Sequence, residues 1–214
     1  MNAATGARLT LTGVAFAFNP GAPIFRDLTA TMAPGDVWGV TGPSGSGKST
    51  LLSLLAGWEA PTAGVMERVG IRRVGWVFQN PHGQAHRTAL DHVVYPIIAR
   101  GGDRASASRR ALRILDELGL VARAESTFAQ LSGGEAQRLM LCRAIAAEPD
   151  LLLVDEPTAQ LDRTNAATVN GVLRSLAGIG AIVVVATHDQ DTVAACTHRL
   201  TLDRATIAAE GHRS

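Results

Sequence analysis

Gly42-Pro43-Ser44-Gly45-Ser46-Gly47-Lys48-Ser49-Thr50 is the stretch that decides the fold of this chain. It fits the GxxxxGK[ST] pattern of a phosphate-binding loop, which an ordinary Gly/Ser-rich turn rarely satisfies. Glycines permit the backbone angles that turn successive N–H groups into one concavity, where an anion binds. Lys48 is the only lysine among the 20 basic residues, and its slim ammonium fits a tight loop better than a guanidinium does. We therefore expect a phosphate site between a buried strand and a helix.

Strand-like and helix-like segments alternate on both sides of this loop. Residues 37–41 read as a short buried strand before it, and residues 49–57 as the helix after it. The remaining segments are expected as strands at 9–14, 24–32, 73–78, 151–155 and 181–186, helices at 104–118, 135–147, 165–176 and 191–196, and a terminal hairpin of 199–202 with 206–209. This order predicts one α/β domain over residues 8–210. Its core comprises residues 8–79 and 149–210, and a helical subdomain occupies about residues 80–148.

Composition limits the classes of protein to which the chain can belong. Its 214 residues are 46% hydrophobic, which suits one globular domain with a real core. The net charge of +1 gives no field that would attract nucleic acid or an anionic membrane. Cys142 and Cys196 lie far apart and form no disulfide or metal-binding pattern, so we expect reduced thiols. No apolar run approaches the ~20 residues of a membrane-spanning helix, and Met1 to Arg8 lack the apolar core of a secretory signal.

A second motif is the apolar run Leu151 to Val154, which ends in the carboxylates of Asp155 and Glu156. Parallel strands of α/β folds present such residues at their carboxyl ends, beside the bound ligand. Alone, an Asp-Glu pair is equally typical of a solvated turn. Together with the phosphate loop, it predicts that Asp155 holds Mg²⁺ and that Glu156 orients the attacking water as general base.

The third motif is Leu131-Ser132-Gly133-Gly134-Glu135-Ala136-Gln137-Arg138. Ser132 and Glu135 form the pattern of a capping box at a helix N-terminus, and we expect that box to form. It does not explain the two glycines, which weaken the first turn but open its N–H groups to an anion. A second phosphate-binding helix end suggests that the nucleotide is contacted by two copies of the chain.

With these motifs, the chain resembles the ATP-binding cassette (ABC) ATPases over about residues 9–202, nearest to the lipoprotein-release and macrolide-efflux type. The resemblance implies a P-loop NTPase core with a mixed sheet, an antiparallel β-subdomain and an inserted α-helical subdomain. It also implies that Phe18 stacks on adenine and that Gln79 senses magnesium. Asp162 would end the loop that contacts the opposite subunit, and His188 would be the switch histidine on the γ-phosphate.

The resemblance further implies a head-to-tail dimer, expected to be a homodimer, that sandwiches ATP and Mg²⁺ and couples hydrolysis to a large motion. The groups that perform the reaction would be Lys48, Gln79, Glu156 and His188. Mg²⁺ would be held by Ser49, Gln79 and Asp155. ATP would contact Phe18, residues 42–50 and, from the second chain, Ser132, Gly133, Gly134 and Asp162.

Two interpretations remain for what the motion driven by hydrolysis does. The first is a peripheral ATPase subunit at the cytoplasmic face of the cell membrane, docked on separately encoded permease subunits. Residues 88–101 look like a permease-facing stretch, although the same apolar residues would equally pack the helical subdomain. Phe78-Gln79-Asn80-Pro81 is as similar to vitamin and metal-ion importers, so substrate and direction stay open.

The second reading is an ABC ATPase that regulates a membrane or cell-division complex without moving a solute. Members of the family that act in DNA repair carry a long coiled coil between the two phosphate motifs. Here only about 80 residues without heptads intervene, which disfavours that class. Translation members usually hold two cassettes in one chain, whereas this sequence has one, and we expect no nucleic-acid partner.

Overall fold

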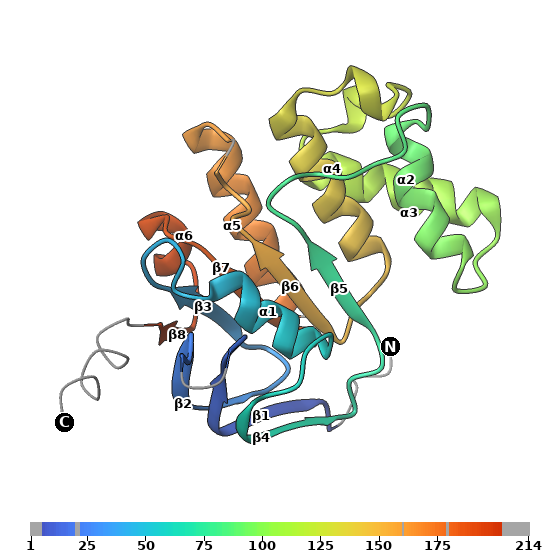
Figure 1. Cartoon of the computed structure of the whole chain (residues 1–214). Coiled ribbons are helices and arrows are strands. Elements are labelled where there is room, and N and C mark those ends of the chain that lie inside the picture. The colour runs from blue at the N-terminus through green and yellow to red at the C-terminus, as the bar shows by residue number, and fades with distance from the viewer. Residues whose placement is uncertain (1–5, 20–21, 160, 179, 203–214) are drawn as a thin grey trace, which may run out of the picture.

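The computed structural model describes residues 6–19, 22–159, 161–178 and 180–202, and a five-stranded sheet is its centre (Figure 1). The strand order is β5-β6-β7-β3-β8, formed by β5 (Val74–Val77), β6 (Leu151–Asp155), β7 (Ile182–Ala186), β3 (Val37–Thr41) and β8 (His198–Thr201). Every neighbouring pair among these strands is parallel. The carboxyl ends of β3, β6 and β7 therefore meet at one edge of the sheet, which is where α/β folds bind their ligands.

The central strands are apolar along their whole length because both faces of the sheet are covered. Side chains alternate between the faces, since successive residues of a strand point in opposite directions. One face packs on helices α4 (Gly133–Ala146) and α5 (Arg163–Gly178), and the other on α1 (Lys48–Ala56) and a second sheet. The first face receives Val37, Val77, Leu152, Val154, Val183 and Val185, and the second receives Trp38, Val40, Leu151, Leu153, Ile182 and Val184.

The second sheet is antiparallel and three-stranded, with the order β2-β1-β4. It consists of β1 (Arg8–Phe16), β2 (Phe25–Met32) and β4 (Ala63–Val69), and it lies below α1 in Figure 1. Leu9 pairs with Met32, and both side chains are fully buried beneath the core sheet. β4 is a strand that the sequence did not predict.

Among the described residues, three helices belong to the core. α1 (Lys48–Ala56) follows the phosphate loop directly, while α5 (Arg163–Gly178) and α6 (Gln190–Ala194) connect the later strands. Leu51, Leu52, Leu54 and Leu55 of α1 are fully buried, and the helix ends at Gly57 in the left-handed conformation. This arrangement fixes the start of α1, and with it the phosphate loop, against the carboxyl edge of β3.

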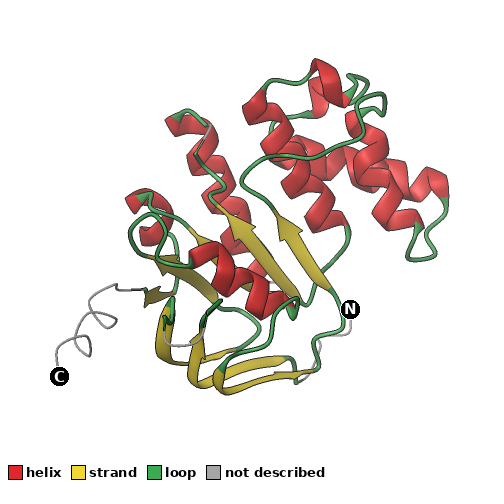
Figure 2. Cartoon of the chain, viewed as in Figure 1, coloured by secondary structure: helices red, strands yellow, loops and turns green. Residues whose placement is uncertain are grey.

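The remaining helices lie between β5 and β6 and form the separate lobe at the upper right of Figures 1 and 2. They are α2 (Ala89–Ile98), α3 (Arg104–Glu117), the 3₁₀ turns Val121–Arg123 and Phe128–Gln130, and α4 (Gly133–Ala146). Their buried faces join the same apolar cluster as one face of the core sheet, so the lobe packs on the core through α4.

The predicted α/β fold is confirmed, with two differences of detail. A mixed core sheet was expected beside an antiparallel β-subdomain, whereas the five described core strands are all parallel and the antiparallel strands β1, β2 and β4 form a sheet of their own. Residues 88–101 contain α2 (Ala89–Ile98), whose Val93, Val94 and Ile97 are buried inside the helical lobe. Most of the apolar residues of this stretch therefore pack internally rather than facing a partner. Residues 206–209, expected to complete a terminal hairpin, lie outside the described residues.

Candidate functional site

A cleft of about 740 Å³ lies at the carboxyl edge of the core sheet. It is bounded by the phosphate loop, by the ends of β5 and β6, and by segments that follow β1 and β7. These segments are far apart in the sequence. The parallel order of the core strands brings most of them to one edge, and the packing of the antiparallel sheet adds the segment after β1. The lining residues are Phe18, Ile24, Gly42, Pro43, Ser44, Gly45, Gly47, Lys48, Ser49, Thr50, Gln79, Asp155, Glu156 and His188.

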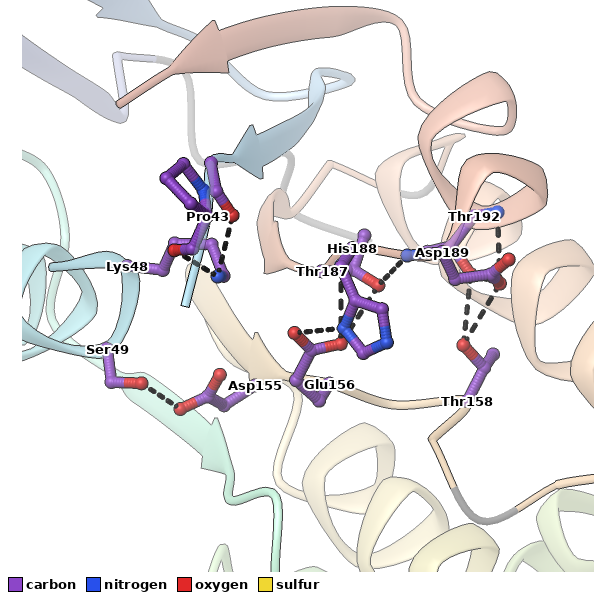
Figure 3. Close-up of polar contacts among 11 residues, drawn as sticks. Pro43, Lys48, Ser49, Asp155, Glu156, Thr158, Thr187, His188, Asp189 and Thr192 are labelled. Atoms are coloured by element: carbon purple, nitrogen blue, oxygen red, sulfur yellow. Dashed lines mark hydrogen bonds and ion pairs between the residues drawn. The ribbon is translucent and has the colours of Figure 1, made fainter. Parts of the chain in front are cut away.

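The phosphate loop depends on glycine at Gly47, the residue before α1. Its φ of 93° lies in the left-handed region, where residues with a Cβ are strained. A Cβ there would also lie 2.3 Å from Cγ2 of Ile24. The Lys48 ammonium donates hydrogen bonds to the carbonyls of Gly42, at 3.0 Å, and Pro43, at 3.3 Å (Figure 3). The chain thus holds a cation at the mouth of a loop whose N–H groups begin a helix, an arrangement suited to phosphate.

Asp155 at the end of β6 faces the loop. The Ser49 hydroxyl donates a hydrogen bond of 2.6 Å to Oδ2 of Asp155 (Figure 3). Burial raises the pKa of Asp155 above its ordinary value, and the neighbouring Glu156 carboxylate raises it further, whereas the Ser49 hydrogen bond and Lys48 oppose the shift. A cation placed between the Ser49 hydroxyl and the Asp155 carboxylate would relieve the cost of burying that carboxylate. Hydroxyl and carboxylate oxygens are the ligands that Mg²⁺ prefers.

Glu156 occupies a strained backbone position at the centre of the cleft. Its φ is 47°, and its N–H donates to the carbonyl of Ala186 at the end of β7. The residue is only 8% exposed, and its carboxylate accepts hydrogen bonds from the Thr187 hydroxyl at 3.1 Å and from the His188 backbone N–H at 3.4 Å. Nδ1 of His188 lies 2.8 Å from Oε1 of Glu156. The His188 side chain is 73% exposed and lines the cleft. The two residues that directly follow β7 therefore hold the Glu156 carboxylate in one direction rather than leaving it free to rotate (Figure 3).

Thr187 was given no role by the sequence, yet it is fully buried and holds Glu156. Its position directly after a buried strand and before His188 is the only sequence signal that marks it. A second hydrogen-bond network is centred on Asp189. Asp189 caps α6 and accepts hydrogen bonds from the hydroxyls of Thr158 and Thr192, at 3.1 and 2.6 Å. These bonds join the segment after Glu156 to the segment after His188.

Phe18, which follows β1, lines the same cleft as the phosphate loop and the carboxylates. Its ring is 68% exposed and meets Phe16 edge to face, with centroids 5.1 Å apart. An aromatic face left open beside a phosphate loop is suited to stacking on a planar base.

Five of the predicted nucleotide contacts do not line the cleft of their own chain. Ser46 belongs to the phosphate loop but is buried, at 2% exposed. The other four lie elsewhere in the chain. Ser132 caps α4, and its capping box with Glu135 forms as expected, with bonds of 3.3 and 2.8 Å. Gly133 and Gly134 form the first turn of α4, in the helical lobe. Asp162 accepts a 2.9 Å hydrogen bond from the Asn165 backbone at the start of α5. None of these residues lines the cleft that contains Lys48.

Comparison with known proteins decides the family. The sequence pattern of the ABC transporter family matches residues 25–159. The chain belongs to the ABC transporter ATPases. A lipoprotein-releasing system ATP-binding protein, LolD, of Cereibacter sphaeroides is 39% identical over 206 residues, which cover 87% of this chain and 92% of the relative. The cell division ATP-binding protein FtsE of Escherichia coli is 34% identical over 201 residues, covering 87% and 90%.

Solved structures of ABC proteins share the fold. An inward-facing putative metal-chelate type ABC transporter is 32% identical with a TM-score of 0.78, over 92% of this chain and 80% of that one. A dimeric ATP-binding cassette in a post-hydrolysis state, bound to ADP and Pi, is 28% identical with a TM-score of 0.78, over 91% and 94%. The predicted family is thereby confirmed, and the chain is an ATP-binding and ATP-hydrolysing cassette of the kind that pairs with membrane components. Within the described ranges, no helix is long and apolar enough to cross a membrane.

Proposed function

We propose that this ABC ATPase hydrolyses Mg²⁺-bound ATP in the cleft around Lys48, and that closure of a two-chain dimer transmits the reaction to a membrane partner. The observation that carries the proposal is the convergence in one cleft of the phosphate loop, the carboxyl ends of β5 and β6, and the exposed Phe18 and His188. The exposed Phe18 ring suits a planar base, and the loop N–H groups and Lys48 suit a polyphosphate.

Binding begins at the loop. The N–H groups of residues 42–50 and the Lys48 ammonium would receive the phosphates, while Phe18 would stack on adenine. Lys48 now donates to two backbone carbonyls of its own loop, and phosphate oxygens would replace those carbonyls as acceptors. We expect Lys48→Ala to lose most of its affinity for a fluorescent ATP analogue, and unchanged affinity would refute this assignment.

The metal would be held at the opposite wall. Ser49 and Asp155 already bring two oxygens within 2.6 Å of each other, and Gln79 lines the same cleft. No cluster of three or more acidic, histidine or cysteine side chains stands ready for a metal in the described part of the chain. That suits Mg²⁺, which uses one or two protein ligands with phosphate oxygens and water. When bound, Mg²⁺ neutralises charge that develops on the phosphates.

Glu156 is the proposed general base. Thr187 and His188 fix the direction of its carboxylate, so that it can orient a water molecule and accept its proton as the water attacks the γ-phosphate. His188 is exposed on the cleft side and would contact the γ-phosphate while it remains bonded to Glu156. Positioning of this kind supplies most of the catalysis in phosphoryl transfer.

The α4 N-terminus would serve the cleft of a second copy of the chain. Ser132, Gly133 and Gly134 lie outside their own cleft, and the dimeric cassette that binds ADP and Pi is 28% identical to this chain. Their N–H groups and the positive end of the helix dipole suit a phosphate supplied by a partner. Each site would then need residues from both chains.

Mixing two inactive variants tests this arrangement. Lys48→Ala disables the cleft, and Gly134→Asp places a carboxylate at the α4 N-terminus. In a head-to-tail dimer of one variant with the other, one site has an intact cleft and an intact α4, so ATPase activity returns on mixing. Activity that stays at the level of the separate variants, although mixed dimers form, would contradict a site shared between chains.

The partner that receives the motion would be an integral-membrane permease, which would hold the chain at the cytoplasmic face of the cell membrane. A row of exposed aromatic side chains between the core and the helical lobe suits such a contact. Trp58, Trp76 and Phe78 stack with neighbouring centroids 4.4 and 5.1 Å apart, and Trp58 and Phe78 remain exposed. Tyr95, the exposed aromatic of α2, carries the Arg87 guanidinium 5.2 Å above its ring.

A second candidate function is regulation of a membrane or cell-division complex without transport, which the 34% identity to FtsE favours. Purification of membrane partners with the Glu156→Gln variant held in ATP separates the two. A permease with many membrane spans that moves a solute on ATP addition supports transport. A partner complex that binds ATP-dependently but moves no solute supports regulation.

A further inference from the structure

Gln137 lies in the second turn of α4 and is only 1% exposed. Its Nε2 donates a 3.2 Å hydrogen bond to the backbone carbonyl of Phe78, which is 59 positions away in the sequence. Its Oε1 is buried and receives no hydrogen bond from any residue in the described ranges. A buried amide that is only half paired contributes little to stability. Its single bond therefore calls for another explanation.

The carbonyl that Gln137 holds belongs to the peptide unit that precedes Gln79. A peptide unit is planar, so fixing the direction of its C=O fixes the direction of the N–H and Cα of the next residue. Phe78 is the first residue after β5, where the ladder with β6 has ended at Val77 and Val154. The Gln137 hydrogen bond therefore orients the backbone at Phe78, directly after the last strand residue that pairs with β6.

Gln79 has little other support. It is exposed, it lines the cleft, and its side chain forms no hydrogen bond with the described residues. The direction in which its side chain enters the cleft is therefore set mainly by its backbone. Phe78 itself is held on its other side by the stacked ring of Trp76, 5.1 Å away.

We propose that Gln137 is a positioning residue for Gln79: from α4, it fixes the Phe78–Gln79 peptide so that the Gln79 amide points to the Mg²⁺ side of the cleft. This inference rests on the proposed role of Gln79. It assigns α4 a task inside its own chain, beside the task of its N-terminus in the second chain. A shift of α4 relative to β5 would then alter the Gln79 position directly.

Gln137→Met tests the proposal because methionine keeps the length of the side chain and removes only the hydrogen bond. The measurement is the Mg²⁺ concentration that gives half-maximal ATPase activity of the full chain. We expect Gln137→Met to raise this concentration about threefold to tenfold, in the lower part of the range of coupling between residues in contact. Gln137→Glu, which sets a carboxylate against the Phe78 carbonyl, should raise it at least as far. Affinity for a fluorescent ATP analogue without Mg²⁺ should stay unchanged for both.

Two further variants keep the proposal separate from its premise. Cys142→Ala removes another buried contact of α4, to the Ile114 carbonyl, and should leave the Mg²⁺ requirement unchanged. Gln79→Ala should raise the requirement, and adding Gln137→Met to it should have no further effect. If Gln79→Ala raises the requirement but Gln137→Met does not, or if the two effects multiply, the inference is wrong and the role of Gln79 stands. If Gln79→Ala has no effect, the role of Gln79 fails and the inference fails with it.

Discussion

Replacing Gly47 by alanine should damage both the stability and the nucleotide site of this ATPase. The residue adopts a φ of 93°, and an added Cβ would lie 2.3 Å from Cγ2 of Ile24 and 3.1 Å from Cδ1 of Phe25. The left-handed backbone costs a residue with a Cβ about 1–2 kcal/mol. Displacing the packed Ile24 side chain costs about 1–3 kcal/mol more.

The two terms together predict a loss of about 2–5 kcal/mol in the free energy of unfolding. For a chain of this size, such a loss lowers the melting temperature by at least about 4 °C. The strain is relieved only if the phosphate loop moves. We therefore also expect weaker ATP binding, at temperatures where the variant is still folded.

Gly171→Ala is the matched control. Gly171 lies inside α5, and a Cβ there would have no atom within 4 Å. The same chemical change should stabilise the chain by about 0.5–1 kcal/mol, because glycine is a poor helix former. Urea denaturation followed by circular dichroism measures both variants. A Gly47→Ala variant with the denaturation midpoint and ATP affinity of the natural chain would refute the reasoning.

Three further predictions concern pH and binding. Burial lowers the pKa of His92, so the folded chain favours the neutral ring. The contribution of His92 to stability should be full above about pH 6.5, and below it the free energy of unfolding should fall by up to about 1.4 kcal/mol per pH unit. In urea titrations, His92→Gln should reduce this slope. The Arg100 hydrogen bond, helped by Arg110, lowers the pKa of Glu148, so the stability that this carboxylate supplies should be present near neutral pH and be lost as pH falls through its lowered pKa. Glu148→Gln should therefore cost about 0.5–1 kcal/mol at pH 7 and little in acid; an equal cost at both would contradict the ion pairs. Phe18→Ala should weaken ATP binding by about 1–3 kcal/mol, while Phe18→Tyr should retain it. If a binding titration gives the two variants equal affinity, Phe18 does not stack on adenine.

Much of the fold could be predicted from the sequence because the central strands carry their own signal. Val37–Thr41 and Leu151–Asp155 match their predicted bounds, since continuous apolar runs of strand length leave few alternatives. β4 was missed because its residues are mostly exposed and lack alternating burial; only pairing with β1 makes it a strand. α2 was not recognised as a helix because Pro96 interrupts its pattern.

The site divides in the same way. Lys48, inside a strict motif, and Glu156, at the end of an apolar strand-length run, were assigned a place at the nucleotide from the sequence, and both line the cleft. The neighbours that aim them were not, because Thr187 reaches Glu156 only through the order of the strands, with β7 beside β6. The contact of Gln137 with Phe78 likewise depends on how the helical lobe packs on β5. Neither contact can be predicted from the spacing of residues in the sequence.

The central claim is that Glu156 activates water in a cleft that binds ATP independently of it. Release of phosphate by Glu156→Gln, measured alongside its binding of a fluorescent ATP analogue, tests that claim most directly. Glutamine keeps the size and most hydrogen bonds of glutamate but cannot accept the water's proton at neutral pH. We expect ATP binding equal to that of the natural chain, with phosphate release reduced to background. Phosphate release at the natural rate, with binding intact, would contradict it.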